Sequence, residues 1–334
     1  MSSGNTVNEF ELIEKYFAPL AKKETGALGL GDDAAILSPP PGKQLVFTTD
    51  GLIEGVHFLD NEDPQDVAAR LIGVNLSDLA AMGSKPWVYN LSLSLPHDIS
   101  SDWLRKFSKE LKILQDYHSI SLIGGDTTAT RGPLILSMTA IGTVNIGKAI
   151  LRSGASAEEL IYVSGTIGDA NLGLSVLKNE IKGLNEKDSN FLTTRYHRPE
   201  PRILLGQNLI GLANSATDIS DGLIADLDHL ASESGLTATI FANKIPFSDA
   251  AKAAFSLNHS LKQQALSGGD DYELLFSVPK KSAEKIIDLS KKINVLLSNI
   301  GEFTHTNDGS KDVVNLIDDQ GQKITPYKKG FSHF

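Results

Sequence analysis

Apolar runs of strand length alternate with amphipathic runs of helix length along almost the whole chain. The clearest helical run, residues 64–82, has Pro64 in its first turn and is followed by Gly83, and strand-like runs at 44–49 and 87–95 flank it. A length of 334 residues corresponds to about two domains. The alternation therefore predicts an α/β or α+β protein in two halves.

A stretch rich in small residues, 145–160, predicts the boundary between the two halves. We expect an N-terminal domain over residues 1–147 and a C-terminal α/β domain over residues 148–334. Polar residues dominate 180–195, which predicts an exposed insertion. The other expected elements are helices at 9–23, 101–117 and 202–213, strands at 34–37, 119–123, 134–144, 161–163 and 236–241, and a strand–helix–strand unit at 272–304.

The net charge of −10 argues against nucleic-acid binding and against docking on anionic lipid, since both need a basic face. The chain has no cysteine, which excludes disulfides, thiolate nucleophiles and Cys-built zinc sites and fits a cytoplasmic protein. The N-terminal residues do not have the basic and apolar pattern of a signal peptide, and no run approaches about 18 apolar residues. We therefore expect neither a signal peptide nor a membrane span.

The chemical signal lies in aspartates that sit in Gly-rich or apolar surroundings, away from Lys and Arg. They occur in the strings GLGDDAAI, LVFTTDGLI, NLSDLAAMG, LIGGDTT, TDISDGL and SGGDDYELLF. Most of these strings end an apolar run or form a turn, where ligands bind in α/β proteins. Six strings of the same kind predict a shared site better than six separate helix caps or turns, although each one alone has that ordinary explanation.

Asp78 is the most informative of these aspartates, because it falls late in the apolar helix predicted at 64–82, three residues after Asn75. A carboxylate there meets the negative end of the helix dipole, and burial without a partner costs several kcal/mol. A divalent cation removes that cost, and carboxylate and hydroxyl oxygens select Mg²⁺ or Ca²⁺ over zinc or copper. Neighbouring hydroxyls come from Thr48, Thr49, Thr127 and Thr128. The set is typical of a nucleotide or phosphoryl-transfer site.

Two phosphate-binding patterns are incomplete in this chain. Residues 142–149 (GTVNIGKA) lack the final Ser or Thr of a P-loop, and residues 29–34 (GLGDDA) lack the strand that precedes a dinucleotide fingerprint. Arg152, in a Gly-flanked turn, is a candidate phosphate clamp or a plain surface charge. Similarly, His57 either faces the cleft or is structural, and Tyr117 and Phe331 offer a flat ring to a ligand or belong to the core.

Taken together and in this order, the six strings, TTDGLIEGVHF, LRSGA and the closing KKGFSHF resemble the thiamine-monophosphate kinase family. That family belongs to the ATP-binding superfamily of aminoimidazole ribonucleotide synthetase. The resemblance implies a two-domain fold, a homodimer paired through the N-terminal sheets, and Mg²⁺-assisted transfer of the ATP γ-phosphoryl group to thiamine monophosphate. This is the last step of thiamine diphosphate synthesis. A phosphate monoester has a second pKa of about 6 and is already anionic, so no general base is expected.

Matching motifs carry the family's site residues to this chain. The implied ligands of several Mg²⁺ ions are Asp33, Thr48, Thr49, Asp50, Asp78, Asp126, Asp218 and Asp221. The implied ATP contacts are Tyr117, Gly125, Asp126, Arg152 and Ser220. The implied thiamine phosphate contacts are His57, Asp270 and Phe331. Position 270 is Asp where similar enzymes carry Glu, and Phe331 replaces a polar aromatic residue of some relatives.

Two other functions are compatible with the same pattern. One is another ATP-dependent synthetase of the superfamily that acts on a purine precursor, and the other is a non-enzymatic module that binds divalent cations. The selenium-transferring relative is disfavoured because its reactive N-terminal Cys or selenocysteine is absent.

Overall fold

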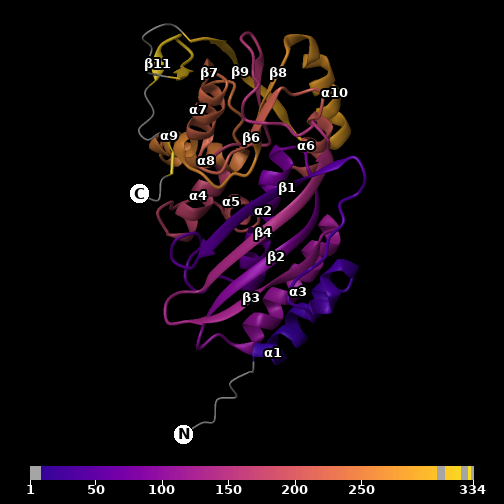
Figure 1. Ribbon diagram of the computed structural model, residues 1–334. Coiled ribbons are helices and arrows are strands. Elements are labelled where there is room, and N and C mark those ends of the chain that lie inside the picture. The colour runs from indigo at the N-terminus through magenta and orange to yellow at the C-terminus, as the bar shows by residue number, and fades with distance from the viewer. Residues whose placement is uncertain (1–8, 307–312, 325–329, 332–334) are drawn as a thin grey trace. The chain divides into compact units, whose positions relative to one another are not determined.

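The computed structural model describes residues 9–306, 313–324 and 330–331 (Figure 1). The chain forms two compact units. Unit 1 comprises Met1–Leu79 and Lys85–Ile146, and unit 2 comprises Ala80–Ser84 and Gly147–Phe334. Among the described helices, none has the length and apolar character needed to cross a membrane.

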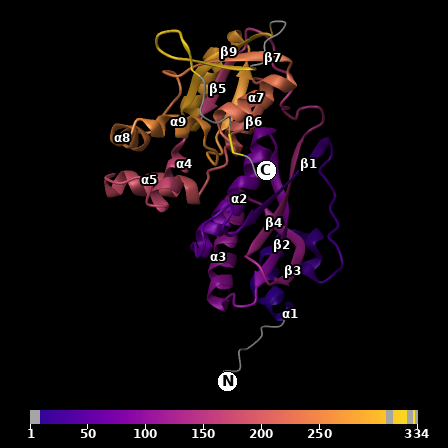
Figure 2. The ribbon, with the colours of Figure 1, turned by 90° about the vertical axis from the view of Figure 1, so that its left-hand side faces the viewer.

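Unit 1 is built on a four-stranded sheet in the order β1-β4-β2-β3, from β1 (Lys43–Ile53), β2 (Lys85–Pro96), β3 (Ser121–Thr130) and β4 (Ile135–Asn145). The β2–β3 pair is parallel, and the β1–β4 and β4–β2 pairs are antiparallel. Helices α2 (Pro64–Ala81) and α3 (Ser101–His118) lie on the same side of this sheet (Figure 2). Side chains alternate along each strand, so Leu136 and Met138 of β4 are buried on that face.

Short helical pieces precede the sheet: α1 (Glu9–Leu12), a π turn (Ile13–Phe17) and 3₁₀ turns (Ala18–Ala21 and Thr25–Leu30). The prediction of one continuous helix over 9–23 was wrong. Pro19 has no amide hydrogen to donate, and the chain tightens into a 3₁₀ turn around it. Ala21 and Ala27 pack with Val88, Ile123 and Ile141, so this segment covers part of the sheet face opposite α2 and α3.

Unit 2 is built on a seven-stranded sheet in the order β11-β10-β7-β9-β5-β8-β6. Its strands are β5 (Leu160–Ser164), β6 (Ser215–Asp218), β7 (Leu236–Phe241), β8 (Leu274–Val278), β9 (Leu297–His305), β10 (Val314–Ile317) and β11 (Lys323–Ile324). Its helices are α4 (Asp169–Leu177), α5 (Glu186–His197), α6 (Ile203–Leu209), α7 (Leu223–Glu233), α8 (Asp249–Leu257), α9 (Ser260–Ser267) and α10 (Ala283–Ile293). Alternation along β8 sends Leu275 into a core shared with α7, and Phe276 into a core shared with α6 and α10.

The polar stretch predicted at 180–195 is largely exposed, as expected, and from Glu186 onward it forms the helix α5. Leu192 of this helix packs with α8 and α9 through Ala251, Ala254 and Leu261 in a separate apolar cluster. Asn185 caps the helix, since its side chain accepts a hydrogen bond from the amide of Asp188. Few apolar side chains are enough to anchor a helix on one face, which is why the polar composition did not reveal this helix.

Two other expectations also need correction. The predicted strand at 34–37 is irregular backbone, held by a hydrogen bond from the Ile36 amide to the Gly26 carbonyl. The predicted strand at 119–123 continues as β3 through Gly124, Gly125 and Asp126 to Thr130. The aspartate of this string is therefore inside a strand, paired in register with Ser92 of β2.

Candidate functional site

Three predicted metal ligands, Thr48, Asp50 and Asp78, meet in unit 1 between β1 and α2. Alternation along β1 directs Thr48 and Asp50 toward the face that α2 covers. The Thr48 hydroxyl donates a short hydrogen bond to Asp78 Oδ2, and the Asp50 amide donates to Asn75 Oδ1 at 3.1 Å. Asn75 and Asp78, which lie about one turn apart on α2, therefore both contact β1.

The electrostatics of Asp50 and Asp78 favour a bound cation. Burial and the charge of Asp78 together raise the pKa of Asp50 to about 6. Two carboxylates and one hydroxyl form an all-oxygen donor set, which suits a hard ion such as Mg²⁺. A bound cation would replace the repulsion between the two carboxylates with attraction to both.

A cavity of about 680 Å³ lies on the opposite face of the unit 1 sheet, beneath the N-terminal segment. Its polar lining includes Asp32, Asp33, Asn90 and Asp126. The volume falls within the range of small-molecule sites. Three carboxylates give the cavity a negative potential, so an anionic ligand needs cations to accompany it.

The glycines of the LIGGDTT string let β3 run close to β2 at the floor of this cavity. Gly125 has φ +154°, and a Cβ there would lie 1.8 Å from the carbonyl oxygen of Leu91. The exposed carboxylate of Asp126 follows directly, with Oδ1 accepting the Thr127 amide at 2.9 Å. Thr49 lies on the same face and shares a hydrogen bond of 2.8 Å with Thr139, which lines the cavity.

The predicted ligands of unit 1 therefore form two sets on opposite faces of one sheet. Thr48, Asp50 and Asp78 are on the helix-covered face, whereas Asp33 and Asp126 are at the cavity. Across residues 9–306, 313–324 and 330–331, no group of three or more His, Asp or Glu side chains is arranged to hold a metal ion.

The other predicted contacts in unit 1 occupy separate positions. His57 lies in the turn after β1, and its Nδ1 accepts the Ile53 amide at 3.0 Å, which leaves Nε2 to carry the proton of a neutral ring. Tyr117 lies near the end of α3 with 79% of its surface exposed, and its ring meets His118 edge-on. The described wall of the cavity includes Gly125 and Asp126 but not Tyr117.

Main-chain hydrogen bonds in unit 2 join three of the motifs that were separate in sequence. The Asp270 amide donates to the Ser220 carbonyl at 2.8 Å, and the Phe331 amide donates to the Asp221 carbonyl at 3.0 Å. Asp218 ends β6 just before this segment and is 2% exposed. The described part of the C-terminal motif, Gly330 and Phe331, thus lies beside the DISDGL string.

Asp226, which the sequence reasoning missed, organises this segment. Its Oδ2 accepts the amides of Asp221 and Gly222, both at 3.1 Å, at the start of α7. Burial and the nearby charge of Asp221 raise the pKa of Asp226 to about 7, and Arg152 opposes the rise. The available signal was an acidic residue in the first turn after a Gly. The interaction also places Arg152 near the DISDGL string.

Comparison with known proteins gives the family. Two family models match, AIR synthase related protein, N-terminal domain, over residues 31–144, and AIR synthase related protein, C-terminal domain, over residues 157–314. The thiamine-monophosphate kinase of Escherichia coli (strain K12) is 43% identical over 327 residues, which cover 98% of each chain. The chain belongs to the thiamine-monophosphate kinase family.

Solved structures of thiamine-monophosphate kinases confirm the two-domain α/β fold. The crystal structure of the enzyme from Stenotrophomonas maltophilia K279a is 38% identical, with a TM-score of 0.83 over 95% of this chain and 98% of that one. A structure described as AaThiL complexed with AMPPCP and TMP is 32% identical, with a TM-score of 0.77 over 93% of this chain and 98% of that one. The fold class and the family expected from the sequence are both confirmed.

Proposed function

We propose that the chain transfers the γ-phosphoryl group of ATP to thiamine monophosphate, giving thiamine diphosphate and ADP. The observation that carries the proposal is the identity of 43% with a thiamine-monophosphate kinase over 98% of both chains. A relative of known structure that binds AMPPCP and TMP supports the same pair of substrates. The reaction takes place in the cytoplasm on this proposal.

Magnesium ions fit the oxygen-only donor sets of both units. We propose that Thr48, Asp50 and Asp78 hold metal on one face of the sheet, with Asp33, Thr49 and Asp126 on the other face. Asp218 and Asp221 of unit 2 complete the proposed set. When bound, Mg²⁺ neutralises the charge of the phosphates, which a protein of charge −10 otherwise repels.

The remaining proposed contacts bind and orient the two substrates. Gly125 and Asp126, the first two proposed ATP contacts, line the cavity of unit 1. Arg152 and Ser220 in unit 2, and Tyr117 in unit 1, are the other proposed ATP contacts. We assign His57, Asp270 and Phe331 to thiamine monophosphate. Orientation of the anionic acceptor oxygen toward the γ-phosphorus is the chief task of these residues.

The decisive experiment incubates the protein with ATP, Mg²⁺ and thiamine monophosphate and follows thiamine diphosphate by chromatography. Formation of thiamine diphosphate that depends on both Mg²⁺ and thiamine monophosphate is the expected result. Ring closure of a formylglycinamidine ribotide, with no thiamine diphosphate formed, would instead identify the synthetase alternative. A rise in melting temperature with Ca²⁺, without a further rise from Mg²⁺ and ATP, would identify a cation-binding module.

We also propose that the protein is a homodimer paired through the unit 1 sheets. The proposal follows from the family resemblance. It is compatible with the sheet order, because β1 is an edge strand with part of its surface exposed.

A further inference from the structure

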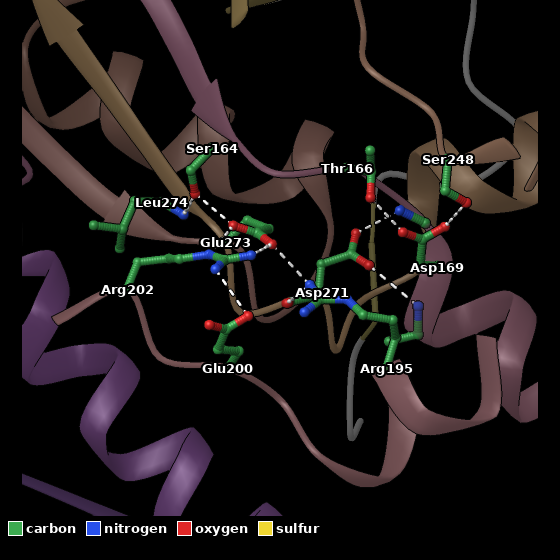
Figure 3. A network of polar contacts seen from close by, with 12 residues as sticks. Ser164, Thr166, Asp169, Arg195, Glu200, Arg202, Ser248, Asp271, Glu273 and Leu274 are labelled. Carbon is green, nitrogen blue, oxygen red and sulfur yellow. Dashed lines mark hydrogen bonds and ion pairs between the residues drawn. The ribbon is translucent and has the colours of Figure 1, made fainter. Parts of the chain in front are cut away.

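A buried ionic network lies beside the loop that carries Asp270, and none of its members is among the proposed ligands (Figure 3). We propose that Glu273, held by Arg195 and Arg202, is a positioning residue that sets the conformation of the loop 268–272 and thereby the affinity for thiamine monophosphate. The proposal rests on the proposed function for the identity of the substrate. Its structural part does not depend on the reaction.

The Glu273 side chain is fully buried, and each of its two carboxylate oxygens accepts two hydrogen bonds. Its Oε2 accepts Arg202 Nε at 2.6 Å and Ser164 Oγ at 2.5 Å, and its Oε1 accepts Arg202 Nη2 at 2.5 Å and Arg195 Nη2 at 2.8 Å. Burial by itself would raise the pKa of Glu273, but the hydrogen bonds and charges of Arg202 and Arg195 hold it below its usual value. The carboxylate is therefore ionised at neutral pH and fixed in one orientation.

The network reaches the loop through its main chain. Arg195 Nη2 also donates to the carbonyl oxygen of Asp271 at 3.3 Å. The Asp271 carboxylate, 1% exposed, accepts the amides of Gly168 at 2.6 Å and Ala170 at 3.3 Å at the start of α4. The loop is thus held on one side by an arginine and on the other by a helix N-terminus.

The loop needs such support because its backbone is strained. Asp270 has φ 73° and Tyr272 has φ 51°, left-handed conformations that non-glycine residues adopt only at a cost in energy. Strain of this kind persists only where the surroundings enforce it, and it gathers at ligand sites. The Tyr272 hydroxyl also lies 3.4 Å from Asp270 Oδ1, so the two strained residues meet again at their side chains.

The strained loop is fitted against the neighbouring DISDGL segment. Tyr272 donates its amide to the Ile219 carbonyl at 2.8 Å, and a Cβ at position 269 would lie 2.1 Å from the Ser220 carbonyl oxygen. A shift of the loop therefore moves Asp270 relative to that segment. Buried ion pairs add little net stability because desolvation offsets their attraction, so a positioning role accounts for this network better than stability does.

The test compares Glu273→Gln with Glu159→Gln. Glu159 is a matched control because it is also buried, 5% exposed, at the other end of the same β5–β8 pair, where its side chain accepts hydrogen bonds from Asn214 and from Ser277 Oγ at 2.7 Å. We expect Glu273→Gln to raise the KM for thiamine monophosphate roughly 10- to 100-fold, the effect of a misplaced contact. The KM for ATP should stay within about threefold, and Glu159→Gln should change neither constant.

Two milder variants keep the test informative if Glu273→Gln does not fold. Arg195→Met removes the cation that contacts both Glu273 and the Asp271 carbonyl, whereas Arg195→Lys keeps a donor there. We expect the KM for thiamine monophosphate to rise in Arg195→Met and to return most of the way in Arg195→Lys. Equal increases of both Michaelis constants in Arg195→Met would contradict the proposal and indicate general damage to unit 2.

Amide hydrogen exchange tests the positioning without reference to catalysis. The amides of Asp270 and Tyr272 should exchange at least about tenfold faster in Glu273→Gln or Arg195→Met than in the wild type or Glu159→Gln. Unchanged exchange at both amides would overturn the inference whether or not the protein makes thiamine diphosphate. Faster exchange in a protein that makes no thiamine diphosphate would support the positioning role of Glu273 and would rule out thiamine monophosphate as the substrate.

Discussion

Single carboxylates in this protein are placed where their charge is costly without a partner. Asp50 shows this most clearly, because burial and the charge of Asp78 raise its pKa to about 6. An arrangement that destabilises the metal-free protein is expected where metal binding is the purpose. Stability and activity should therefore respond in opposite directions when one of these charges is removed.

We predict that Asp78→Asn stabilises the metal-free protein while removing most of the turnover. The asparagine keeps an oxygen for the Thr48 hydroxyl but no longer repels Asp50. The free energy of unfolding in the absence of Mg²⁺ should rise by on the order of 1 kcal/mol, measured by urea denaturation. Asp98→Asn, at an exposed position in the turn between β2 and α3, is the control and should change neither quantity. Full turnover in Asp78→Asn would remove the argument for a metal at this position.

Asp271 makes the stability of unit 2 depend on pH. Burial is the main cause that raises its pKa well above 3.8, so the folded state holds this proton more tightly than the unfolded chain does. The stabilisation that this proton gives to the folded state is complete below about pH 4, and it is lost as the pH rises through the raised pKa of Asp271. We predict that the melting temperature of Asp271→Asn increases relative to that of the wild type as the pH rises from about 4 to about 8.

Calorimetry at several pH values checks this difference between the two proteins. Asp249→Asn, at a fully exposed side chain in α8, should follow the wild-type curve at a constant offset. A constant offset for Asp271→Asn as well would show that Asp271 is ionised in both the folded and the unfolded states.

At the scale of elements, β3 depends on a glycine that no other residue can replace. A Cβ at Gly125 would lie 1.8 Å from the Leu91 carbonyl oxygen, and its φ of +154° is unfavourable for other residues. We predict that Gly125→Ala lowers the free energy of unfolding by about 2–4 kcal/mol and weakens ATP binding, measured by denaturation and calorimetry. Gly51→Ala in β1 is the control, because its nearest contact is an ordinary 3.7 Å. Similar losses in the two variants would contradict this account.

The elements that the sequence predicted well are those with strong local signals. The helix α2 follows from Pro64 at its start, Gly83 after its end and a continuous apolar stripe between them. The irregular segment at 34–37 and the helix α5 were misjudged, because tertiary contacts decide them: a hydrogen bond from Ile36 to Gly26 in one, and packing of Leu192 in the other. Local propensity carries no information on such partners.

The same limit explains why the sequence revealed the candidate ligands but not the buried residues that hold their loops in place. The aspartate strings identified Asp50, Asp78 and Asp126 because the residue type and its apolar neighbours are visible in sequence. Asp226 was missed although its two amide partners lie only four and five residues before it, because its burial is not visible in sequence. Glu273 was missed because its role comes from burial and from partners far along the chain, such as Arg202. Whether the predicted ligands share metal ions is a proposal that activity and binding measurements decide.

At the scale of the whole molecule, the net negative charge of the protein opposes the approach of anionic substrates. A net charge of −10 repels both ATP and thiamine monophosphate over long distances. Binding should therefore depend on divalent cations more than on a basic surface, and Arg152 is the one cation among the proposed ligands. This balance also explains why the predicted site consists chiefly of aspartates.

The proposed dimer gives the last prediction, which concerns assembly. Phe47 is 61% exposed on β1, an edge strand of the unit 1 sheet, and it faces away from the helices α2 and α3. Aromatic side chains are enriched at protein–protein interfaces, so this exposed ring is a candidate contact of the proposed dimer. We expect sedimentation to give about twice the chain mass of 35.9 kDa, and Phe47→Glu to weaken association at least about tenfold. Leu257→Glu, at a residue 51% exposed in unit 2, should leave the dimer intact. A wild-type monomer at micromolar concentration would contradict the dimer, and a Phe47→Glu dimer of unchanged affinity would move the interface elsewhere.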